Sequence, residues 1–355
     1  MIRPGATLGI IGGGQLGRMM AIAAAELGLY VHVFDREKDC PASHVACKTT
    51  VAEYSDTEAL QEFVKTVDVI TFEFENIPHE SLELLESSKP VFPSANILKI
   101  SRNRIREKTF INGLGIATAK FRQVTSVNAL QAAVKELGLP AVLKTTELGY
   151  DGKGQVTLKP GSDLVAGWKT LNASEAILEG FVDFSKEISV IVARGADGKA
   201  VPYVPVENIH KNHILDITIA PAAIDAKLSQ EAEKIAVKIA EALDLRGLLA
   251  VEMFVTSDNR VLVNELAPRP HNSGHWTLDA AVTSQFEQAI RAVCGMPLGS
   301  PARLCDARMK NLIGDDVNDL EKYMADKNTK LHLYGKKEAR PGRKMGHVTT
   351  LNPQK

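Results

Sequence analysis

Two acidic residues late in the chain, Glu252 and Glu265, lie in consecutive apolar segments whose alternating pattern predicts two strands. The expected strands are Leu249 to Val255 and Val261 to Leu266, joined by a polar hairpin connection. Two carboxylates that face each other across a sheet repel, so nothing structural recommends the pair. A divalent cation would remove the repulsion, and carboxylates, phosphate oxygens and water are ligands that Mg²⁺ prefers. The pattern predicts a Mg²⁺ site, with an exposed ion-pair face as the alternative.

The register of this hairpin decides whether the two carboxylates meet. If the loop is Ser257 to Arg260, then Thr256 pairs with Val261. The same register places Glu252 directly opposite Glu265, on one face of the sheet.

Hydrogen-bonding and cationic side chains are concentrated after this hairpin. Residues 267–276 read APRPHNSGHW, a run dense in Arg, His and Asn and held by two prolines. Polar loops on a rigid scaffold commonly carry function. Residues 336–344 contain five Lys or Arg side chains around the turn Pro341-Gly342. This second run is either a solvated tail or, because the turn fixes its cations, a phosphate site.

A glycine-rich segment in the middle of the chain predicts a loop around a polyphosphate. The apolar run Pro140 to Thr145 carries Lys144 and enters residues 149–155, which read GYDGKGQ. Glycines let backbone N–H groups approach phosphate oxygens, and Lys144 and Lys153 supply positive charge. A β-hairpin with a glycine-rich turn is the alternative.

The N-terminal region predicts a βαβ unit. A buried strand at Ala6 to Ile11 leads into G-x-G-x-x-G at residues 12–17, a helix from about Arg18 to Leu27, and a strand at Tyr30 to Asp35. This motif alone suggests a dinucleotide-binding oxidoreductase. The same glycines occur wherever a strand turns sharply into a tightly packed helix, so the motif predicts a Rossmann-like half without specifying NAD.

A third strand is expected at Val67 to Phe72, followed directly by Glu73, Glu75 and Asn76. Side chains at the carboxyl end of a parallel strand lie where open α/β sheets bind ligands, although a solvated turn explains them equally well. The helical pattern from Asn96 to Gly115 is basic, and such a charge run is typical of a solvated helix face.

The remaining pattern predicts an α+β section with antiparallel strands, and then further helices and strands. Helices are expected at Ser126 to Leu137, at Ser229 to Leu243 and from about Ser284. Strands are expected at Gln155 to Leu158, Ala176 to Val182, Ser185 to Ala193, Val201 to Glu207, Lys310 to Ile313 and Lys330 to Tyr334.

Composition narrows the class of protein. The 355 residues suggest two or three domains, and 45% apolar with 24% charged residues is typical of a globular protein. The formal net charge is −1, so no global field favours nucleic acid or membrane. The four cysteines lack C-x-x-C spacing, which favours reduced thiols in a cytoplasmic protein. We expect neither a signal peptide nor a membrane span.

Four motifs together resemble the N5-carboxyaminoimidazole ribonucleotide synthetase family, ATP-grasp enzymes of purine biosynthesis. They are GGGQLGR at 12–18, GYDGKGQ at 149–155, VNELAPRPHNSGHW at 263–276 and RPGRKMGH at 340–347. The resemblance implies an α/β and α+β protein with an ATP-grasp fold. Its expected parts are a Rossmann-like (pre-ATP-grasp) domain at 1–103, an ATP-grasp region at 104–298 with a lid at about 118–183, and a C-terminal segment at 299–355.

The resemblance also implies binding residues, assigned by motif position. The implied ATP ligands are Arg104, Lys144, Gly149, Tyr150, Asp151, Gly152, Lys153, Gly154, Gln155, Glu179, Gly180, Phe181, Val182, Glu187, His210, Asn264 and Glu265. Mg²⁺, or Mn²⁺ in its place, falls to Glu252 and Glu265. The implied ribonucleotide ligands are Gln15, Glu73, Asn76, Arg269, His271, Lys336, Arg340 and Arg343.

The implied reaction converts ATP, bicarbonate and 5-aminoimidazole ribonucleotide into N5-carboxyaminoimidazole ribonucleotide, ADP and phosphate. We expect ATP to phosphorylate bicarbonate first, giving carboxyphosphate that the amine consumes inside a closed pocket. Asp151, Lys336 and Arg269 are the expected catalytic residues. The alternatives are another ATP-grasp ligase, such as formate-dependent phosphoribosylglycinamide formyltransferase, an NAD-dependent oxidoreductase, and a catalytically dead nucleotide-binding subunit. Relatives suggest a homodimer.

Overall fold

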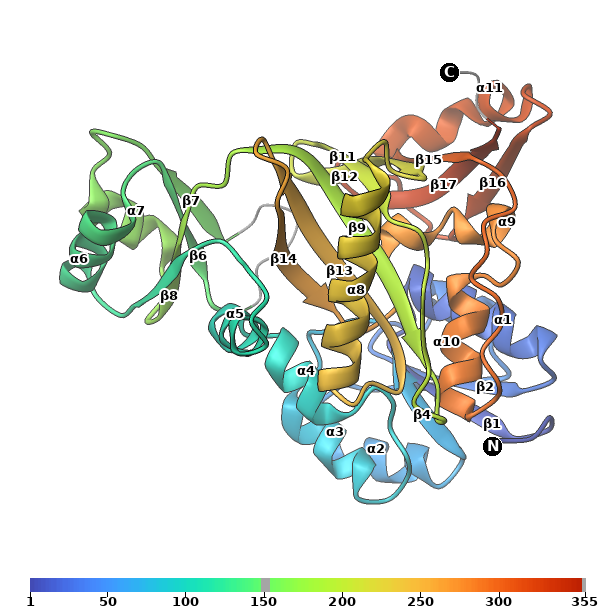
Figure 1. Ribbon diagram of the computed structural model, residues 1–355. Helices are drawn as coiled ribbons and strands as arrows, with labels where there is room; N and C mark the ends of the chain where they lie inside the picture. The colour runs from blue at the N-terminus through green and yellow to red at the C-terminus, as the bar shows by residue number, and fades with distance from the viewer. Residues whose placement is uncertain (148–153, 353–355) are drawn as a thin grey trace.

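The computed structural model describes residues 1–147 and 154–352 and contains three β-sheets (Figure 1). The first sheet has four parallel strands in the order β3-β2-β1-β4. Its strands are β1 (Thr7–Ile11), β2 (Tyr30–Asp35), β3 (Lys48–Val51) and β4 (Val69–Phe72). The βαβ unit predicted from the N-terminal glycine motif is therefore confirmed, with Gly28 ending the helix at a φ of 74°.

Helices cover both faces of this parallel sheet. One face packs on α1 (Gln15–Glu26), and the other packs on α2 (Thr57–Val64), α3 (His79–Glu86) and α4 (Ala95–Ser101). The alternation of buried residues explains the two layers, because Leu8 and Ile10 point toward α1 whereas Ile11 points toward α2 and α3. A short 3₁₀ turn, η1 (Pro41–His44), follows β2.

A nine-stranded antiparallel sheet forms the centre of the molecule. Eight strands follow the order β14-β13-β9-β11-β12-β15-β17-β16, and β10 pairs with β9. The strands are β9 (Phe184–Arg194), β10 (Ala200–Pro202), β11 (Val206–Lys211), β12 (Ile214–Ala220), β13 (Gly247–Thr256), β14 (Val261–Ala267), β15 (Ala307–Ile313), β16 (Thr329–Leu333) and β17 (Lys344–Leu351).

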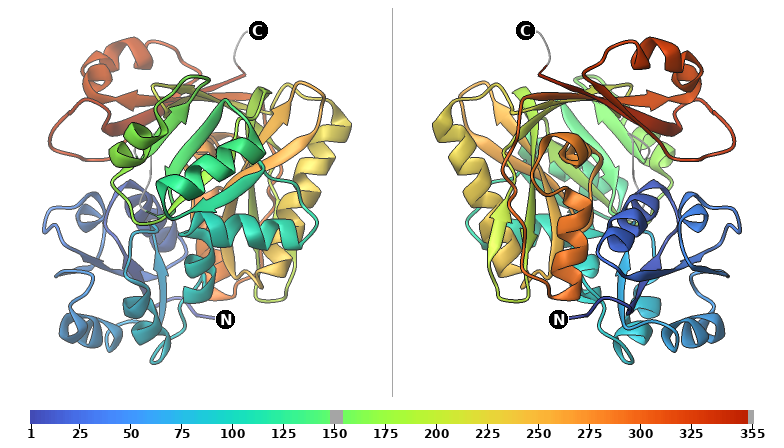
Figure 2. Two further views of the ribbon diagram at one scale, coloured as in Figure 1. Left: turned by 90° about the vertical axis from the view of Figure 1, so that its left-hand side faces the viewer. Right: turned by 90° about the vertical axis from the view of Figure 1, so that its right-hand side faces the viewer.

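Alternate residues of β9 and β13 build two separate cores on this sheet. Val190 and Val251 pack toward α8 (Ala226–Ala242), whereas Ile191 and Ala250 face the layer that contains Trp276. On this second side, α10 (Gln285–Cys294) contacts both the central sheet and α1. It therefore lies between the N-terminal domain and the sheet (Figures 1 and 2). The remaining helical turns are η2 (Asn272–Gly274), α9 (Thr277–Ala280), η3 (Gly314–Asp319) and α11 (Leu320–Met324).

A small antiparallel sheet with two helices projects from one side of the central sheet (Figure 1). Its strand order is β5-β8-β6-β7, and α6 and α7 pack against it. The elements are β5 (Phe121–Val124), α6 (Val127–Leu137), β6 (Ala141–Thr145), β7 (Gln155–Leu158), α7 (Leu164–Leu171) and β8 (Ala176–Gly180). The predicted α+β section is confirmed, and it is called the lid below.

Three expectations about individual elements are wrong. The basic helix divides into α4 and α5 (Arg104–Gly113), because Asn103 accepts hydrogen bonds from two amides and caps α5. The strand expected at 201–207 divides into β10 and β11. Val255, rather than Thr256, pairs with Val261.

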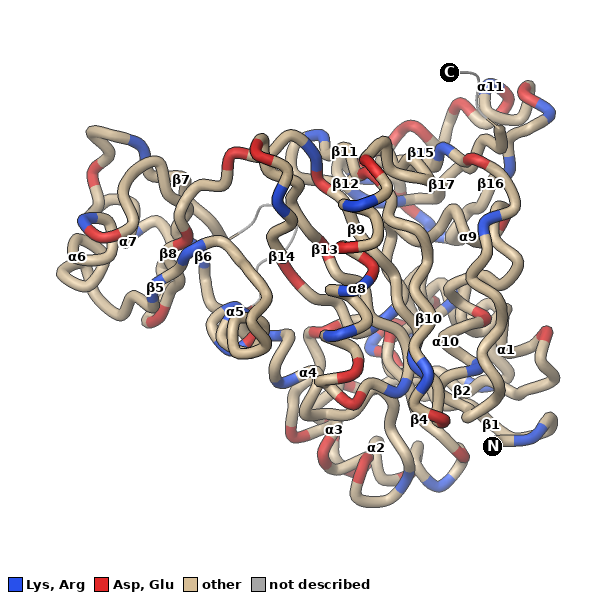
Figure 3. The backbone as a smooth tube through the Cα atoms, viewed as in Figure 1, with Lys and Arg blue, Asp and Glu red and all other residues tan. Residues whose placement is uncertain are grey.

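Charged side chains of both signs are interspersed along the chain (Figure 3). This distribution agrees with the formal net charge of −1. Within residues 1–147 and 154–352, none of the helices combines the length and the apolar character needed to cross a bilayer.

Candidate active site

A cleft of about 770 Å³ lies where the N-terminal domain, α5, the lid and the central sheet meet. It collects predicted site residues from distant parts of the sequence. Those that line it are Gln15, Glu73, Asn76, Arg104, Lys144, Gln155, Phe181, Glu187, His210, Glu252, Asn264, Glu265, Arg269 and His271. The fold therefore brings most of the described candidates to one cavity.

The two carboxylates at the centre of this cleft are neighbours on adjacent strands. Glu252 on β13 is paired with Glu265 on β14, as the sequence predicted. The predicted register was wrong by one residue at the hairpin end, and a β-bulge between Glu252 and Met253 corrects it. Asn264 is the extra residue of the bulge, since Met253 pairs with Val263.

The two carboxylates differ electrostatically. Burial opposes ionisation of Glu252, but the adjacent His271, together with His210 and Arg269, outweighs burial and lowers the pKa of Glu252 to about 2. Burial and the neighbouring charge of Glu252 both raise the pKa of Glu265. The Glu265 side chain is nonetheless open to the cleft. A cation bound between the two would relieve the repulsion that raises this pKa.

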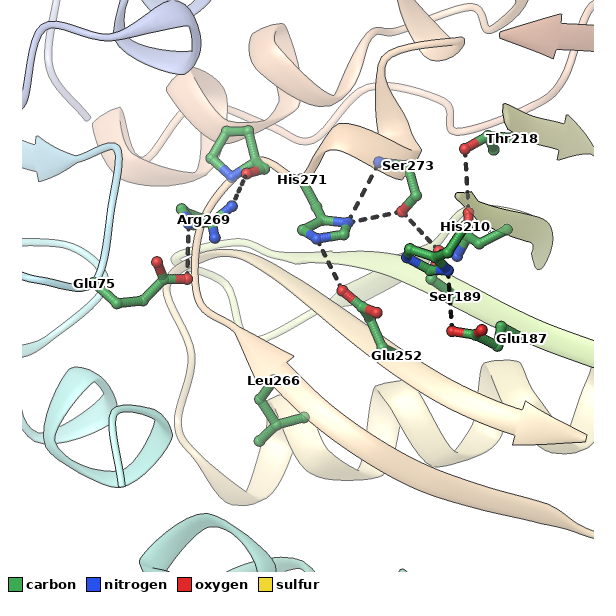
Figure 4. A network of polar contacts seen from close by, with 12 residues as sticks. Glu75, Glu187, Ser189, His210, Thr218, Glu252, Leu266, Arg269, His271 and Ser273 are labelled. Carbon is green, nitrogen blue, oxygen red and sulfur yellow. Dashed lines mark hydrogen bonds and ion pairs between the residues drawn. The ribbon is translucent and has the colours of Figure 1, made fainter. Parts of the chain in front are cut away.

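A buried chain of hydrogen bonds orients His271 (Figure 4). His271 Nε2 lies 2.9 Å from Glu252, while Nδ1 accepts from the Ser273 backbone amide at 3.3 Å. Because an amide can only donate, Nε2 is the nitrogen that donates to Glu252. The Ser273 hydroxyl lies 2.9 Å from Nδ1 and 2.7 Å from the Ser189 hydroxyl. Asn208 donates to Ser189 at 3.0 Å, which anchors the chain in the central sheet.

Lys144 of the lid is held by a buried carboxylate. Its Nζ lies 2.8 Å from Glu179, and Lys108 of α5 lies 3.4 Å from the other Glu179 oxygen. Burial opposes ionisation of Glu179, but the two lysines outweigh it and lower its pKa. Glu179 is therefore an internal ion-pair partner rather than a wall of the cleft. Arg104 donates to the Thr145 carbonyl at 3.2 Å, beside Lys144.

Phe181, Glu187 and His210 line the cleft, whereas Gly180 and Val182 beside Phe181 do not. The backbone amides of Gly180 and Phe181 donate to Lys120 and Pro140 carbonyls, and Val182 is half-buried. His210 Nδ1 lies 3.1 Å from Glu187. Burial lowers the pKa of His210, but the carboxylates of Glu187, Glu252 and Glu265 together outweigh burial and raise it.

Arg269 connects the loop after β14 to the N-terminal domain. Its Nε lies 2.7 Å from Glu75, and Nη1 donates to the Pro270 carbonyl (Figure 4). Glu75 thus forms an inter-domain ion pair, a third possibility beside the ligand-binding and solvated roles considered from the sequence. Asn76 lines the cleft next to it.

The glycine motif at the N-terminus of α1 is already occupied by protein carboxylates. Glu73 accepts from the amides of Gly14 and Gly17, the latter at 2.8 Å, and Asp35 accepts from Gly13 at 2.6 Å. These are the amides that would bind a dinucleotide pyrophosphate. Their occupation argues against the NAD-dependent alternative.

Most of the C-terminal cations lie outside the cleft wall. Lys344 lines the cleft, whereas Lys336, Arg340 and Arg343 do not belong to its wall. Lys336 donates to the Lys344 carbonyl at 2.7 Å, and burial together with the Arg343 charge lowers its pKa to about 8. Arg340 is exposed and pairs with Glu338.

Five predicted nucleotide ligands lie outside the described residues: Gly149, Tyr150, Asp151, Gly152 and Lys153. Gly154, where the description resumes, accepts from the Thr145 amide at 2.9 Å. Sequence reasoning missed Glu107, which lines the cleft, and Lys108. One signal pointed to Glu107, because it lies three residues after Arg104 and therefore on the same helix face.

Comparison with known families identifies all three segments of the chain. The ribonucleotide synthetase pre-ATP-grasp domain family matches residues 5–102, and the ATP-grasp domain family matches residues 109–286. The phosphoribosylaminoimidazole carboxylase C-terminal domain family matches residues 307–355. An N5-carboxyaminoimidazole ribonucleotide synthase from Brucella melitensis is 48% identical over 99% of this chain and 98% of its own length. The chain belongs to the N5-carboxyaminoimidazole ribonucleotide synthase family.

Other members of the synthase family agree in sequence and in structure. A bifunctional purine synthesis protein from Dictyostelium discoideum is 49% identical over 98% of this chain, which spans 37% of that protein. A crystal structure of an ADP complex of the synthetase superposes with a TM-score of 0.96 at 47% identity, covering 99% of this chain and 94% of that one. The Aspergillus clavatus synthase in complex with ADP and 5-aminoimidazole ribonucleotide has a TM-score of 0.90 at 29% identity, with coverage of 98% and 93%.

Membership in the synthase family confirms the fold class inferred from the four motifs. The protein is an ATP-grasp ligase with a pre-ATP-grasp N-terminal domain and a C-terminal domain of the same family. The NAD-dependent oxidoreductase is set aside on two grounds, the family and the occupied glycine motif.

Proposed function

We propose that this chain catalyses the ATP-dependent carboxylation of 5-aminoimidazole ribonucleotide by bicarbonate. The products are N5-carboxyaminoimidazole ribonucleotide, ADP and phosphate, in purine biosynthesis. Support comes from family membership and from the ADP and ribonucleotide named for the Aspergillus relative. The observation that carries the proposal is the cleft itself, in which Glu252 and Glu265 lie with Arg104 and Lys144.

In this proposal ATP lies between the lid and the central sheet. Arg104, Lys144 and the residues 149–155 would bind its phosphates, because they combine cations with backbone amides. The backbone of 179–182 would contact the adenine, and Glu187 would accept the ribose hydroxyls. His210, Asn264 and Glu265 would complete the nucleotide contacts.

We further propose that Mg²⁺, or Mn²⁺ in its place, binds at Glu252 and Glu265. Within the described residues no group of three or more His, Cys, Asp or Glu side chains is arranged to hold a metal ion. A site with two carboxylates fits Mg²⁺, which commonly takes its other ligands from nucleotide phosphates and water. When bound, the ion would neutralise charge on the transferring phosphoryl group.

The reaction divides into two steps. Bicarbonate oxygen attacks the γ-phosphorus of ATP, the bond to the β-phosphate oxygen breaks, and carboxyphosphate and ADP form. Carboxyphosphate releases CO₂ and phosphate, and the exocyclic amine of the ribonucleotide then attacks CO₂ and loses a proton. Lys144 and Arg104 would stabilise the first step electrostatically. Asp151 and Lys336 are the proposed groups that handle the proton or hold the intermediate.

The ribonucleotide would lie at the N-terminal side of the cleft. Gln15, Asn76, Arg269 and His271 would contact it, and Glu73 would shape that wall through its hold on α1. Its phosphate would bind Lys336 and Arg343 of the C-terminal turn, and Arg340 of the same turn would lie close to the substrate. Such binding requires those side chains to turn toward the cleft.

The same proposal covers the organisation of the protein. We assign the domains as 1–103, 104–298 with a lid at about 118–183, and 299–355, and the three family matches fall within or close to these limits. A homodimer in the cytoplasm remains the expected state.

A comparison of acceptors tests the activity. ADP release is measured with bicarbonate plus 5-aminoimidazole ribonucleotide, and separately with formate plus glycinamide ribonucleotide, each with and without Mg²⁺. We expect turnover only in the first mixture and only with the metal. Turnover with formate would instead assign the formyltransferase activity, and NADH oxidation in place of ADP release would overturn the ligase.

A further inference from the structure

The strand that carries Glu265 is an edge strand whose outer side is covered by α5. β14 pairs with β13 on one side and is the terminal strand of the central sheet. Near its start, the Val263 amide donates to the Ala117 carbonyl at 2.9 Å. Beyond Val263, side chains of α5 form the hydrogen bonds to the backbone of β14 on the side away from β13. These contacts lie directly beside the carboxylate pair.

Two consecutive residues of α5 hold the backbone on either side of Glu265. Lys108 Nζ donates to the Asn264 carbonyl at 2.8 Å. The Leu266 amide donates to a carboxylate oxygen of Glu107 at 2.7 Å. The peptide groups that precede and follow Glu265 are therefore both fixed by one turn of one helix.

We call the contacts of Glu107 and Lys108 with the backbone around Glu265 the clamp. The clamp lies beside the point where the β13–β14 ladder is interrupted. Asn264 is the bulge residue without a partner on β13, so the sheet alone leaves the backbone next to Glu265 less constrained. Lys108 and Glu107 are 1% and 2% exposed, so water competes little for their hydrogen bonds. A bulge re-aims the side chains beside it, and a buried clamp fixes the direction.

Lys108 also connects this strand to the lid. Its ammonium lies 3.4 Å from one oxygen of Glu179, whose other oxygen lies 2.8 Å from Lys144. The Glu265 backbone and the Lys144 ammonium are thus joined through two buried charged side chains. A shift of α5 would displace both groups together.

We propose that Glu107 and Lys108 are positioning residues that aim Glu265 at the bound metal. The inference deepens the proposed function and rests on the proposed metal site at Glu252 and Glu265. In their proposed role, Glu107 and Lys108 do not contact the reacting atoms. Their contribution is the orientation of a ligand on a strand that the sheet leaves partly unsupported.

Binding of Mn²⁺ in the presence of ADP, followed by electron paramagnetic resonance, tests the clamp without catalysis. Lys108→Met removes the donor to Asn264, and Glu107→Leu removes the acceptor for Leu266. Partners that orient a metal ligand are commonly worth about 10- to 100-fold in metal affinity, so we expect a loss of about tenfold or more in each. Glu107→Gln keeps an oxygen acceptor and should retain most of the affinity.

Lys238→Met is the matched control. Lys238 also donates to a backbone carbonyl, that of Leu114 at 2.7 Å, but its side chain is exposed on α8. Its affinity for Mn²⁺ should equal that of the wild type. If Lys108→Met does not fold, the pair Glu107→Leu and Glu107→Gln decides the question.

Glu265→Gln distinguishes a failure of the proposed metal site from a failure of the proposed positioning role of Glu107 and Lys108. If this variant binds Mn²⁺ as tightly as the wild type, the metal site itself is wrong and the clamp loses its role. If Glu265→Gln loses the metal while the Lys108 and Glu107 variants bind it normally, the clamp is refuted and the metal site stands. Equal losses in Glu107→Leu and Glu107→Gln would also refute it.

Discussion

His271 donates to Glu252 across 2.9 Å, from a loop that follows β14 to a carboxylate on β13. This hydrogen bond joins the loop after β14 to the neighbouring strand β13. His271 was expected to contact the ribonucleotide, and its observed contact makes it a partner of the proposed metal ligand as well. Both roles are compatible, because the ring also lines the cleft.

Replacing His271 separates these roles. His271→Gln can place an amide donor near the former Nε2, whereas His271→Asn is too short to reach Glu252. We expect His271→Asn to raise the Mg²⁺ concentration for half-maximal ADP release by about 10- to 100-fold, with a smaller change in His271→Gln. Steady-state rates at varied Mg²⁺ measure this. A raised KM for the ribonucleotide with unchanged Mg²⁺ dependence in His271→Asn would place the residue on the substrate alone.

Glu265→Gln should almost abolish phosphate release. The substitution keeps the shape of the side chain but removes the negative charge that a cation requires. Mutation of a residue that only orients a metal ligand lowers metal affinity or activity by up to about a hundredfold. Loss of the ligand itself should therefore lower ATP turnover by about a hundredfold or more. A coupled ADP assay measures the rate, with Glu231→Gln, an exposed substitution on α8, as the control. Near-normal turnover would remove the metal assignment.

The sequence correctly predicted that the two carboxylates pair, but not the register of the hairpin that carries them. Alternation placed Glu252 and Glu265 on facing strands, and they are paired. The predicted register failed at Thr256, and the bulge at Asn264 restored the pairing. A bulge inserts one residue into a strand without changing the apolar alternation on either side, so no period in the sequence reports it.

Contacts between distant segments could not be predicted from patterns. The helix pattern around Lys108 suggested a solvated face, yet Lys108 is buried because Glu179 and the Asn264 carbonyl, both remote in sequence, lie against it. Likewise, the glycine motif correctly predicted a sharp strand-to-helix turn. It could not reveal that Asp35 and Glu73 occupy the amides that the motif exposes.

Glu73 should contribute to the stability of the N-terminal domain. Its carboxylate accepts two amides at the first turn of α1, and burial raises its pKa against those hydrogen bonds. Glu73→Gln turns one acceptor into a donor facing an N–H group, at a cost of about 1–3 kcal/mol. We expect a lower midpoint of thermal unfolding than in Glu58→Gln, which changes an exposed glutamate in the first turn of α2. Equal midpoints would show that α1 does not depend on this carboxylate.

Buried histidines beside the C-terminal strands should make the protein less stable in acid. His275 and His347 are 1% and 0% exposed, and their ring centroids lie 4.8 Å apart. Burial, together with the charges of neighbouring histidines, holds the pKa of both well below the usual value. In the unfolded chain their pKa returns to about 6.5. Below that pH the unfolded state binds more protons, so the free energy of unfolding falls as pH decreases, by up to about 1.4 kcal/mol per pH unit for each histidine.

His347→Asn tests this pH dependence. The amide oxygen can still accept from the Tyr334 hydroxyl, which lies 2.9 Å from His347 Nδ1, but the side chain cannot bind a proton. Urea unfolding between pH 5 and pH 8 should show a shallower loss of stability below about pH 6.5 than in the wild type. Above pH 7.5 the two curves should run parallel, because neither state takes up protons on these rings. His213→Asn, which replaces an exposed histidine, should keep the wild-type slope. An unchanged slope in His347→Asn would mean that His347 is protonated in the folded protein and that its burial carries no penalty for charge.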